Sequence, residues 1–147
     1  MKIHQLVSGF RPGDAISHNA LSIQNCFKKT WDVDSNIYSE SQHIDETFKN
    51  CCMDYQIINP DPEDIIFLHY SIDTPITDYF LKLNCRKILI YHNVTPAKYF
   101  LGVAFEKVVQ LMKGRERLKD FKGQCELYLA VSQFNANELN QLGLSPI

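Results

Sequence analysis

The feature that most constrains the fold of this 147-residue chain is the alternation of short apolar runs with segments of helical periodicity. The clearest run, 64–70, holds four consecutive large apolar side chains, which is typical of a strand buried on both faces of a parallel sheet. We expect this strand to be central. Strands separated by helices favour parallel pairing, so the sequence predicts one α/β domain over residues 1–147. Other strands are predicted at 3–7, 35–38, 87–91 and 127–131.

Helices are predicted between these strands from apolar residues three and four positions apart. One follows Asp14, whose side chain is a good N-cap, and another follows Thr74, where Pro75 occupies the first helical position. Ser132 is expected to cap the last helix. The remaining helix is expected over 102–119, and a short one over 45–51 lies within the polar connection 39–64.

Charge and cysteine content exclude several classes of protein. Fifteen Lys and Arg against seventeen Asp and Glu give a net charge of −2, so no basic field favours nucleic acid as a partner. The five cysteines have no CxxC spacing, which indicates reduced thiols and no metal site. The chain contains neither a signal peptide nor an apolar stretch that could span a membrane. These observations predict a cytoplasmic protein.

Polar residues follow several of the predicted strands at the point where each strand ends. They are the loop Gly9–Asp14, the pair His69 and Tyr70, the pair His92 and Asn93, and Ser132. In an open parallel sheet, ligands bind outside the carboxyl ends of the strands. We therefore expect these residues to converge on one rim of the sheet.

The loop Gly9–Asp14 is a candidate phosphate cradle, because its backbone amides and the following helix N-terminus can face an anion. Gly13 would allow the backbone to approach the ligand closely. The spacing is neither that of the dinucleotide-binding motif nor that of the P-loop. An ordinary glycine turn followed by an Asp cap remains the alternative interpretation.

His92 is the leading candidate for a catalytic side chain, because it ends a buried strand where a neutral imidazole can bind a substrate hydroxyl. His69 occupies the same position on a neighbouring predicted strand. The alternative is that these histidines only bond loop carbonyls. A basic run at 113–122 is a candidate contact for anionic lipid or for a phosphorylated acceptor, although a solvated helix face has the same composition.

Four segments together resemble the N-terminal domain of family 4 retaining glycosyltransferases. These segments are Ile3–Val7, Gly13–Ala15, Ile90–Pro96 and Val131–Leu139, and they occur in the family's order at predicted strand ends. The resemblance covers essentially the whole chain. It implies the N-terminal half of a GT-B fold, in which two Rossmann-like domains face each other across a cleft and the N-terminal one mainly shapes the acceptor site.

The resemblance also implies roles for particular residues. Gly13 and Asp14 match the loop that approaches the donor diphosphate, and His92 matches the histidine near the transferred sugar. The expected reaction moves a hexosyl group from a nucleotide-sugar to a polysaccharide, glycolipid or small acceptor, with retention of configuration. Neither a metal nor another cofactor is required in that scheme. The remaining expected substrate-binding residues are His69, Tyr70, Asn93 and Ser132.

The family's donor-binding C-terminal domain is expected downstream of residue 147, so the chain by itself is expected to be inactive or nearly so. The alternative function is a self-contained α/β ligand-binding or regulatory module without catalysis. Peripheral contact with an anionic membrane at its inner face is a further expectation, based on the basic run at 113–122.

Overall fold

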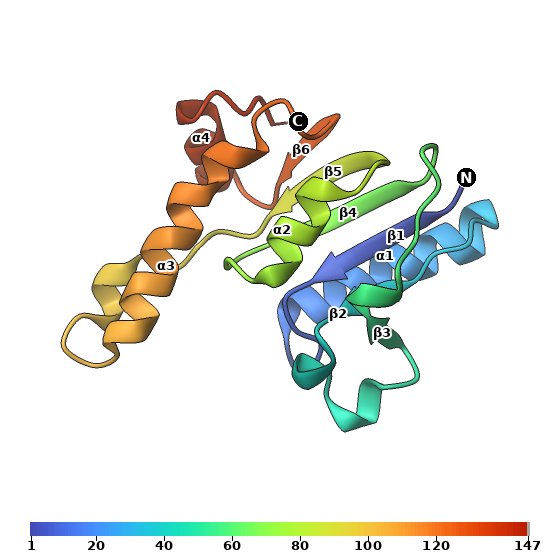
Figure 1. Ribbon diagram of the computed structural model, residues 1–147, viewed down its shortest axis with the longest axis horizontal. Coiled ribbons are helices and arrows are strands. Elements are labelled where there is room, and N and C mark those ends of the chain that lie inside the picture. Colours follow the sequence, from blue (N-terminus) through green and yellow to red (C-terminus); the bar gives the residue numbers. More distant parts are fainter. Residues whose placement is uncertain (147) are drawn as a thin grey trace.

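A computed structural model describes residues 1–146, and these residues form a six-stranded, all-parallel sheet with the strand order β3-β2-β1-β4-β5-β6. The strands that Figure 1 labels are β1 (Ile3–Val7), β2 (Ile37–Ser39), β3 (Cys52–Asp54), β4 (Ile65–Tyr70), β5 (Arg86–Tyr91) and β6 (Leu127–Ala130). β1 and β4 occupy the centre, and both are buried along most of their length. The predicted α/β fold with a Rossmann-like parallel sheet is confirmed.

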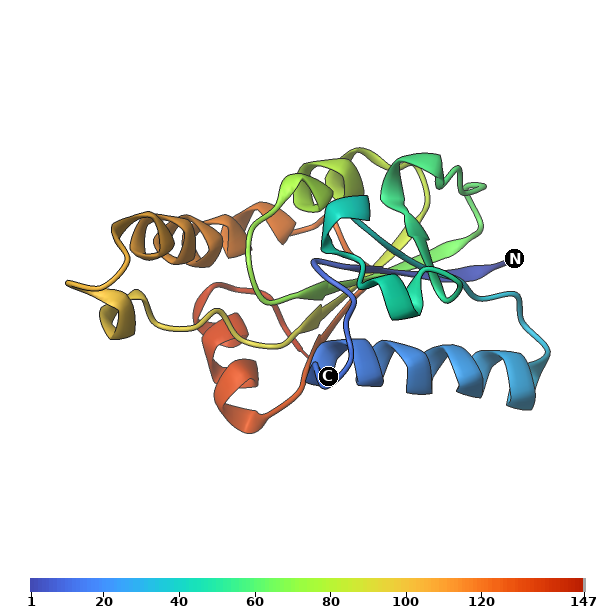
Figure 2. The ribbon, with the colours of Figure 1, turned by 90° about the horizontal axis from the view of Figure 1, so that it is seen from below.

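Helices cover both faces of the sheet. Helix α1 (Ala15–Trp31) lies against one face, where Phe27 packs on Phe67 of β4. Helix α2 (Pro75–Lys82) covers the opposite face and packs on the alternate residues of β4, including Leu68 (Figure 2). The period of two along a strand explains this division, because neighbouring side chains point to opposite faces. Helices α3 (Phe105–Arg117) and α4 (Gln133–Gln141) pack beside the β5 and β6 end.

Most predicted elements are present, with two differences in the polar connection. The short helix expected over 45–51 is only a 3-10 turn, Glu46–Phe48. The three-residue strand β3 was not predicted at all, because Cys52–Asp54 has neither the length nor the apolar alternation of a typical strand. In addition, α3 begins three residues later than expected, because a separate 3-10 turn at Ala97–Phe100 precedes it.

The strand order changes direction at the centre of the sheet, between β1 and β4. After β1 the chain proceeds to β2 and β3 on one side, whereas β4 lies on the other side and leads to β5 and β6. The connections that leave the carboxyl ends of β1 and β4 therefore run to opposite faces. Such a switch point is where open α/β sheets bind ligands.

Candidate functional site

A cavity of about 470 Å³ lies at the carboxyl ends of β1 and β4. It is bounded by the β1–α1 loop, the β4–α2 loop, a 3-10 turn at Ser41–His43 and the first two turns of α3. We call it the crevice. Its lining residues are Ser8, Gly9, Arg11, Asp14, Ile16, His43, Ser71, Ile72, Thr74, Lys107 and Gln110.

The β1–α1 loop is shaped by Gly13 and Asp14, as the sequence suggested. Gly13 has φ +75°, a left-handed conformation that side chains with a Cβ rarely adopt. Asp14 caps α1, and its Oδ2 accepts hydrogen bonds from the Ser17 backbone N–H at 2.8 Å and from Ser17 Oγ at 2.7 Å. The carboxylate charge is thus engaged at the helix end, although Asp14 also lines the crevice.

The electrostatics of the crevice favour an anion. Arg11 and Lys107 enter it from different elements, and within residues 1–146 neither of them forms an ion pair. The N-cap residues of both α1 and α2, Asp14 and Thr74, also lie on its wall, so two helix N-termini face it. Each terminus carries roughly half a positive charge.

A buried hydrogen-bonded chain runs beside the crevice, beneath the carboxyl ends of the central strands. Gln5 Nε2 donates to the Ala20 carbonyl at 2.9 Å, and Gln5 Oε1 lies 2.9 Å from His69 Nε2. His69 Nδ1 in turn lies 2.9 Å from His92 Nε2, with the two rings stacked. The three side chains of this continuous polar chain come from β1, from β4 and from the position directly after β5.

The direction of every bond in this chain follows from its first member. A carbonyl can only accept, so the Gln5 amide nitrogen must face Ala20 and its oxygen must face His69. His69 Nε2 therefore carries the proton. Its Nδ1 is then an acceptor while the ring is neutral, so His92 Nε2 must donate to it. A neutral His92 keeps its proton on Nε2 and presents the Nδ1 lone pair.

Burial keeps both rings neutral near physiological pH. Burial, together with the smaller effect of the neighbouring His92, lowers the pKa of His69 to about 3. Burial also lowers the pKa of His92, and the Asp14 carboxylate opposes that shift only in part. His69 is 1% exposed and cannot touch a ligand, so it acts on His92. His92 is half-buried and does not itself line the crevice, and its Nδ1 can accept a hydrogen bond from a ligand hydroxyl.

Two of the predicted substrate-binding residues face a different part of the molecule. Tyr70 is 1% exposed, and its hydroxyl donates to the Gly114 carbonyl in α3 at 2.6 Å. Asn93 Oδ1 accepts from the Tyr91 hydroxyl at 3.3 Å and from Arg115 Nη2 at 3.4 Å. Neither residue lines the crevice, and burial leaves Tyr70 without access to a ligand.

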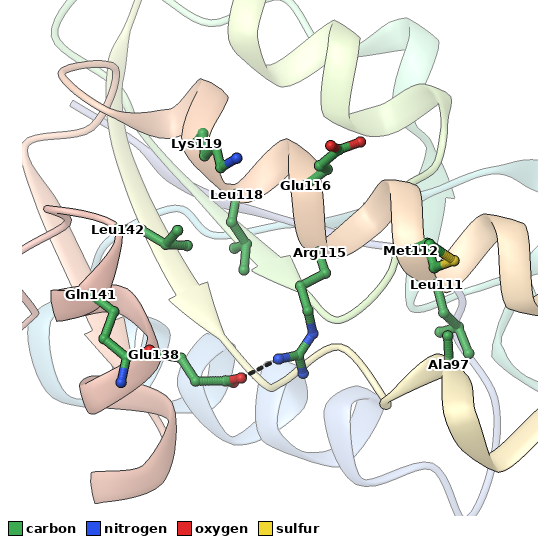
Figure 3. A pocket seen from close by; sticks show the side chains of 10 residues that line it. All are labelled: Ala97, Leu111, Met112, Arg115, Glu116, Leu118, Lys119, Glu138, Gln141 and Leu142. Carbon is green, nitrogen blue, oxygen red and sulfur yellow. Dashed lines mark hydrogen bonds and ion pairs between the residues drawn. The ribbon is translucent and has the colours of Figure 1, made fainter.

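Arg115 organises a second cavity of about 420 Å³ between α3 and α4. Figure 3 shows Arg115 and Glu138 pointing toward one another across it, joined by an ion pair. The guanidinium also donates to the Val94 carbonyl at 2.8 Å, and the Tyr91 hydroxyl donates to Glu138 at 3.0 Å. Arg115 and Glu138 thus satisfy one another, which indicates a structural role for this pair.

Ser132, the last of the predicted substrate-binding residues, lies at the start of α4. Its hydroxyl accepts from the Asn135 backbone N–H at 3.2 Å and so caps α4, as predicted, but it does not line the crevice. Sequence reasoning did not single out Arg11, His43, Lys107 or Gln5. A polar residue inside an apolar strand was a usable signal for Gln5, whereas the approach of Lys107 depends on the packing of α3.

The fold and crevice define a Rossmann-like α/β protein with a candidate anion site at its switch point. Comparison of the chain with protein-family models, curated proteins and solved structures finds no match. Among residues 1–146 no helix is both long and apolar enough to cross a bilayer. Within the same residues, His, Cys, Asp and Glu side chains do not gather in groups of three or more that could hold a metal ion.

Proposed function

We propose that the crevice binds the diphosphate of a nucleotide-sugar and that this chain is the acceptor-side domain of a retaining hexosyltransferase of the GT-B fold. The observation that carries the proposal is the charge of the crevice. Arg11, Lys107 and two helix N-termini face one cavity at the switch point of the sheet. The sequence resemblance supports the same assignment through Gly13 and Asp14, which form the loop at its edge.

In this proposal His92 contacts the donor sugar. A neutral imidazole with a free Nδ1 lone pair accepts a hydrogen bond from a sugar hydroxyl and so helps to orient the anomeric carbon. The acceptor hydroxyl attacks that carbon, the bond to the leaving diphosphate breaks, and a diphosphate oxygen takes the hydroxyl proton. Arg11, Lys107 and the helix N-termini would stabilise charge on the leaving diphosphate.

A non-catalytic anion-binding module is the second candidate function. It is favoured by the way the crevice is enclosed: four segments of the chain surround it and bring Arg11 and Lys107 to one cavity, which is sufficient to hold a small anion. The two candidates share the same anion site. They differ in whether a sugar is transferred.

Calorimetric titration of this chain with inorganic pyrophosphate and with nucleoside diphosphates tests the shared site. Arg11→Ala and Lys107→Ala should each weaken binding by about tenfold or more, because each removes a charged donor to phosphate. Lys49→Ala is the matched control, since Lys49 is an exposed lysine that pairs with Glu46 and does not line the crevice. Absence of pyrophosphate binding, or an equal loss with Lys49→Ala, would refute the anion site.

Transfer or hydrolysis of nucleotide-sugars by the product of the complete reading frame separates the two functions. The glycosyltransferase proposal predicts turnover that falls strongly in His92→Ala while diphosphate affinity is retained. Diphosphate binding without any turnover of nucleotide-sugars would instead establish the binding module.

A further inference from the structure

We propose that the segment from Ala97 to Lys113 is a membrane-docking arm that inserts apolar side chains into an anionic lipid surface. The segment comprises the 3-10 turn Ala97–Phe100, the following loop and most of α3. Figure 1 shows it projecting away from the sheet, with the loop at its far end. This inference rests on exposure and charge, and it is independent of the proposed function.

The tip of the arm exposes an unusual concentration of apolar side chains. Val103 is 84% exposed and Phe105 is 81% exposed. They belong to a set of five large hydrophobic residues within fourteen positions that are all at least 61% exposed: Tyr99, Leu101, Val103, Phe105 and Met112. Soluble domains rarely present such a cluster without a partner.

The shape of this cluster favours a fluid partner. Its most exposed members belong to the loop before α3 and to the first residue of α3, and Figure 1 shows this loop at the end of a projection. A projection needs a surface that deforms around it, as the boundary between lipid headgroups and acyl chains does. Tyr99 adds an aromatic ring with a polar end, the kind of side chain that is enriched at membrane interfaces.

The charge of the arm specifies an anionic surface. Lys98, Lys107 and Lys113 stand in the segment against the single carboxylate of Glu106. Lys98 and Lys113 are exposed, and Lys98 Nζ lies 5.3 Å from the ring centroid of Tyr99. Lysines beside inserted apolar residues can keep their ammonium groups among lipid headgroups.

The structure places the lipid contact mainly before the basic run at 113–122 that the sequence suggested, because the two arginines of that run are engaged in ion pairs while Lys113 belongs to the arm. Arg115 is held by Glu138, and Arg117 forms ion pairs with Asp73, Asp78 and Asp120. The arm keeps its lysines free of ion pairs within residues 1–146. Because Lys107 also lines the crevice, docking through the arm would bring the crevice near the lipid surface.

Sedimentation with sucrose-loaded vesicles tests the proposal. Vesicles of phosphatidylcholine alone are compared with vesicles that also contain phosphatidylglycerol. The chain should sediment with the anionic vesicles, and Val103→Ser with Phe105→Ser should lower the partition coefficient at least about tenfold, because two apolar side chains no longer insert. Lys98→Glu with Lys113→Glu should lower it by about twentyfold or more on anionic vesicles.

Trp31→Ser and Ile57→Ser are the matched controls, because both residues are more than 60% exposed and lie outside the arm. Both should sediment as the unchanged chain does. All four substitutions within the arm affect exposed side chains, so circular dichroism should show unaltered folding. Failure to sediment, or an equal loss with the controls, would overturn the proposal. So would a dimer in size-exclusion chromatography that the Val103 and Phe105 substitutions dissolve, since a second copy would then cover the arm.

Discussion

Substitution of Gln5 by leucine tests the buried chain that orients His92. Gln5 is completely buried, donates to the Ala20 carbonyl and accepts from His69. Leucine has a similar volume but neither group, so the buried His69 N–H loses its acceptor, while the Ala20 carbonyl, which lies inside α1, keeps only its helical bond. An orphaned buried N–H costs about 1–3 kcal/mol and a lost hydrogen bond about 1 kcal/mol, so the variant should lose roughly 3 kcal/mol of its free energy of unfolding. In a domain of this size that corresponds to a melting temperature lower by about 10 °C.

Urea and thermal unfolding monitored by circular dichroism measure this loss. Gln24→Leu is the matched control, because Gln24 makes one hydrogen bond to the Ser35 carbonyl at 2.8 Å and is only half-buried. The control should lose about 1 kcal/mol. Long-range proton–nitrogen NMR spectra add a second readout, since His92 should hold its proton on Nε2 in the unchanged chain and lose that strict preference in Gln5→Leu.

A Gln5→Leu loss no larger than that of Gln24→Leu would refute the role of Gln5 in the buried chain. Such a result would mean that water or a local shift satisfies the Ala20 carbonyl and the His69 N–H. A His92 ring with its proton on Nδ1 in the unchanged chain would equally contradict the assignment of the bond directions.

Three further predictions concern stability and thiol chemistry. Between about pH 6.5 and pH 3 the unfolded chain binds a proton at His69 that the folded chain excludes. The free energy of unfolding should therefore fall on acidification by up to about 1.4 kcal/mol per pH unit from this group. Urea titrations across that range should show a shallower dependence of this free energy on pH in His69→Gln. Tyr70→Phe should cost about 1–2 kcal/mol in the same assay, because the Gly114 carbonyl loses its buried donor. Only Cys26 and Cys51 should react rapidly with a disulfide reagent at neutral pH, because these two thiols are exposed. Burial raises the pKa of each of the other three thiols, so a third fast-reacting thiol would contradict the packing.

The sequence predicted the central part of the fold well because its strands carry strong local signals. The apolar runs that became β4 and β5 are long enough to be read without knowledge of their neighbours. β3 is different: Cys52–Asp54 becomes a strand only because it pairs with β2. Such a strand is fixed by tertiary context, which local patterns do not contain.

The candidate site was predicted only in part, for the same reason. Asp14, which lines the crevice, was marked by its position before a helix, and His69 and His92, which form the buried chain, were marked by their positions at the ends of β4 and β5. Side-chain direction then separated residues that are adjacent in sequence: His69 faces Gln5, whereas Tyr70 faces α3 on the other side of the sheet. A pattern that marks a strand end does not specify which face each residue takes at that end.

The position of β1 between β2 and β4 also affects how the chain assembles during synthesis. β1 can pair with β2 as soon as Ser39 has left the ribosome, but its other edge must wait for β4, since Gln5 pairs with Phe67. Until Tyr70 has emerged, a strand destined for the centre of the sheet has one open edge and uncovered apolar side chains. Nascent chains that end before β4 therefore expose an edge that can pair with another chain, whereas chains that extend beyond β4 have closed that edge.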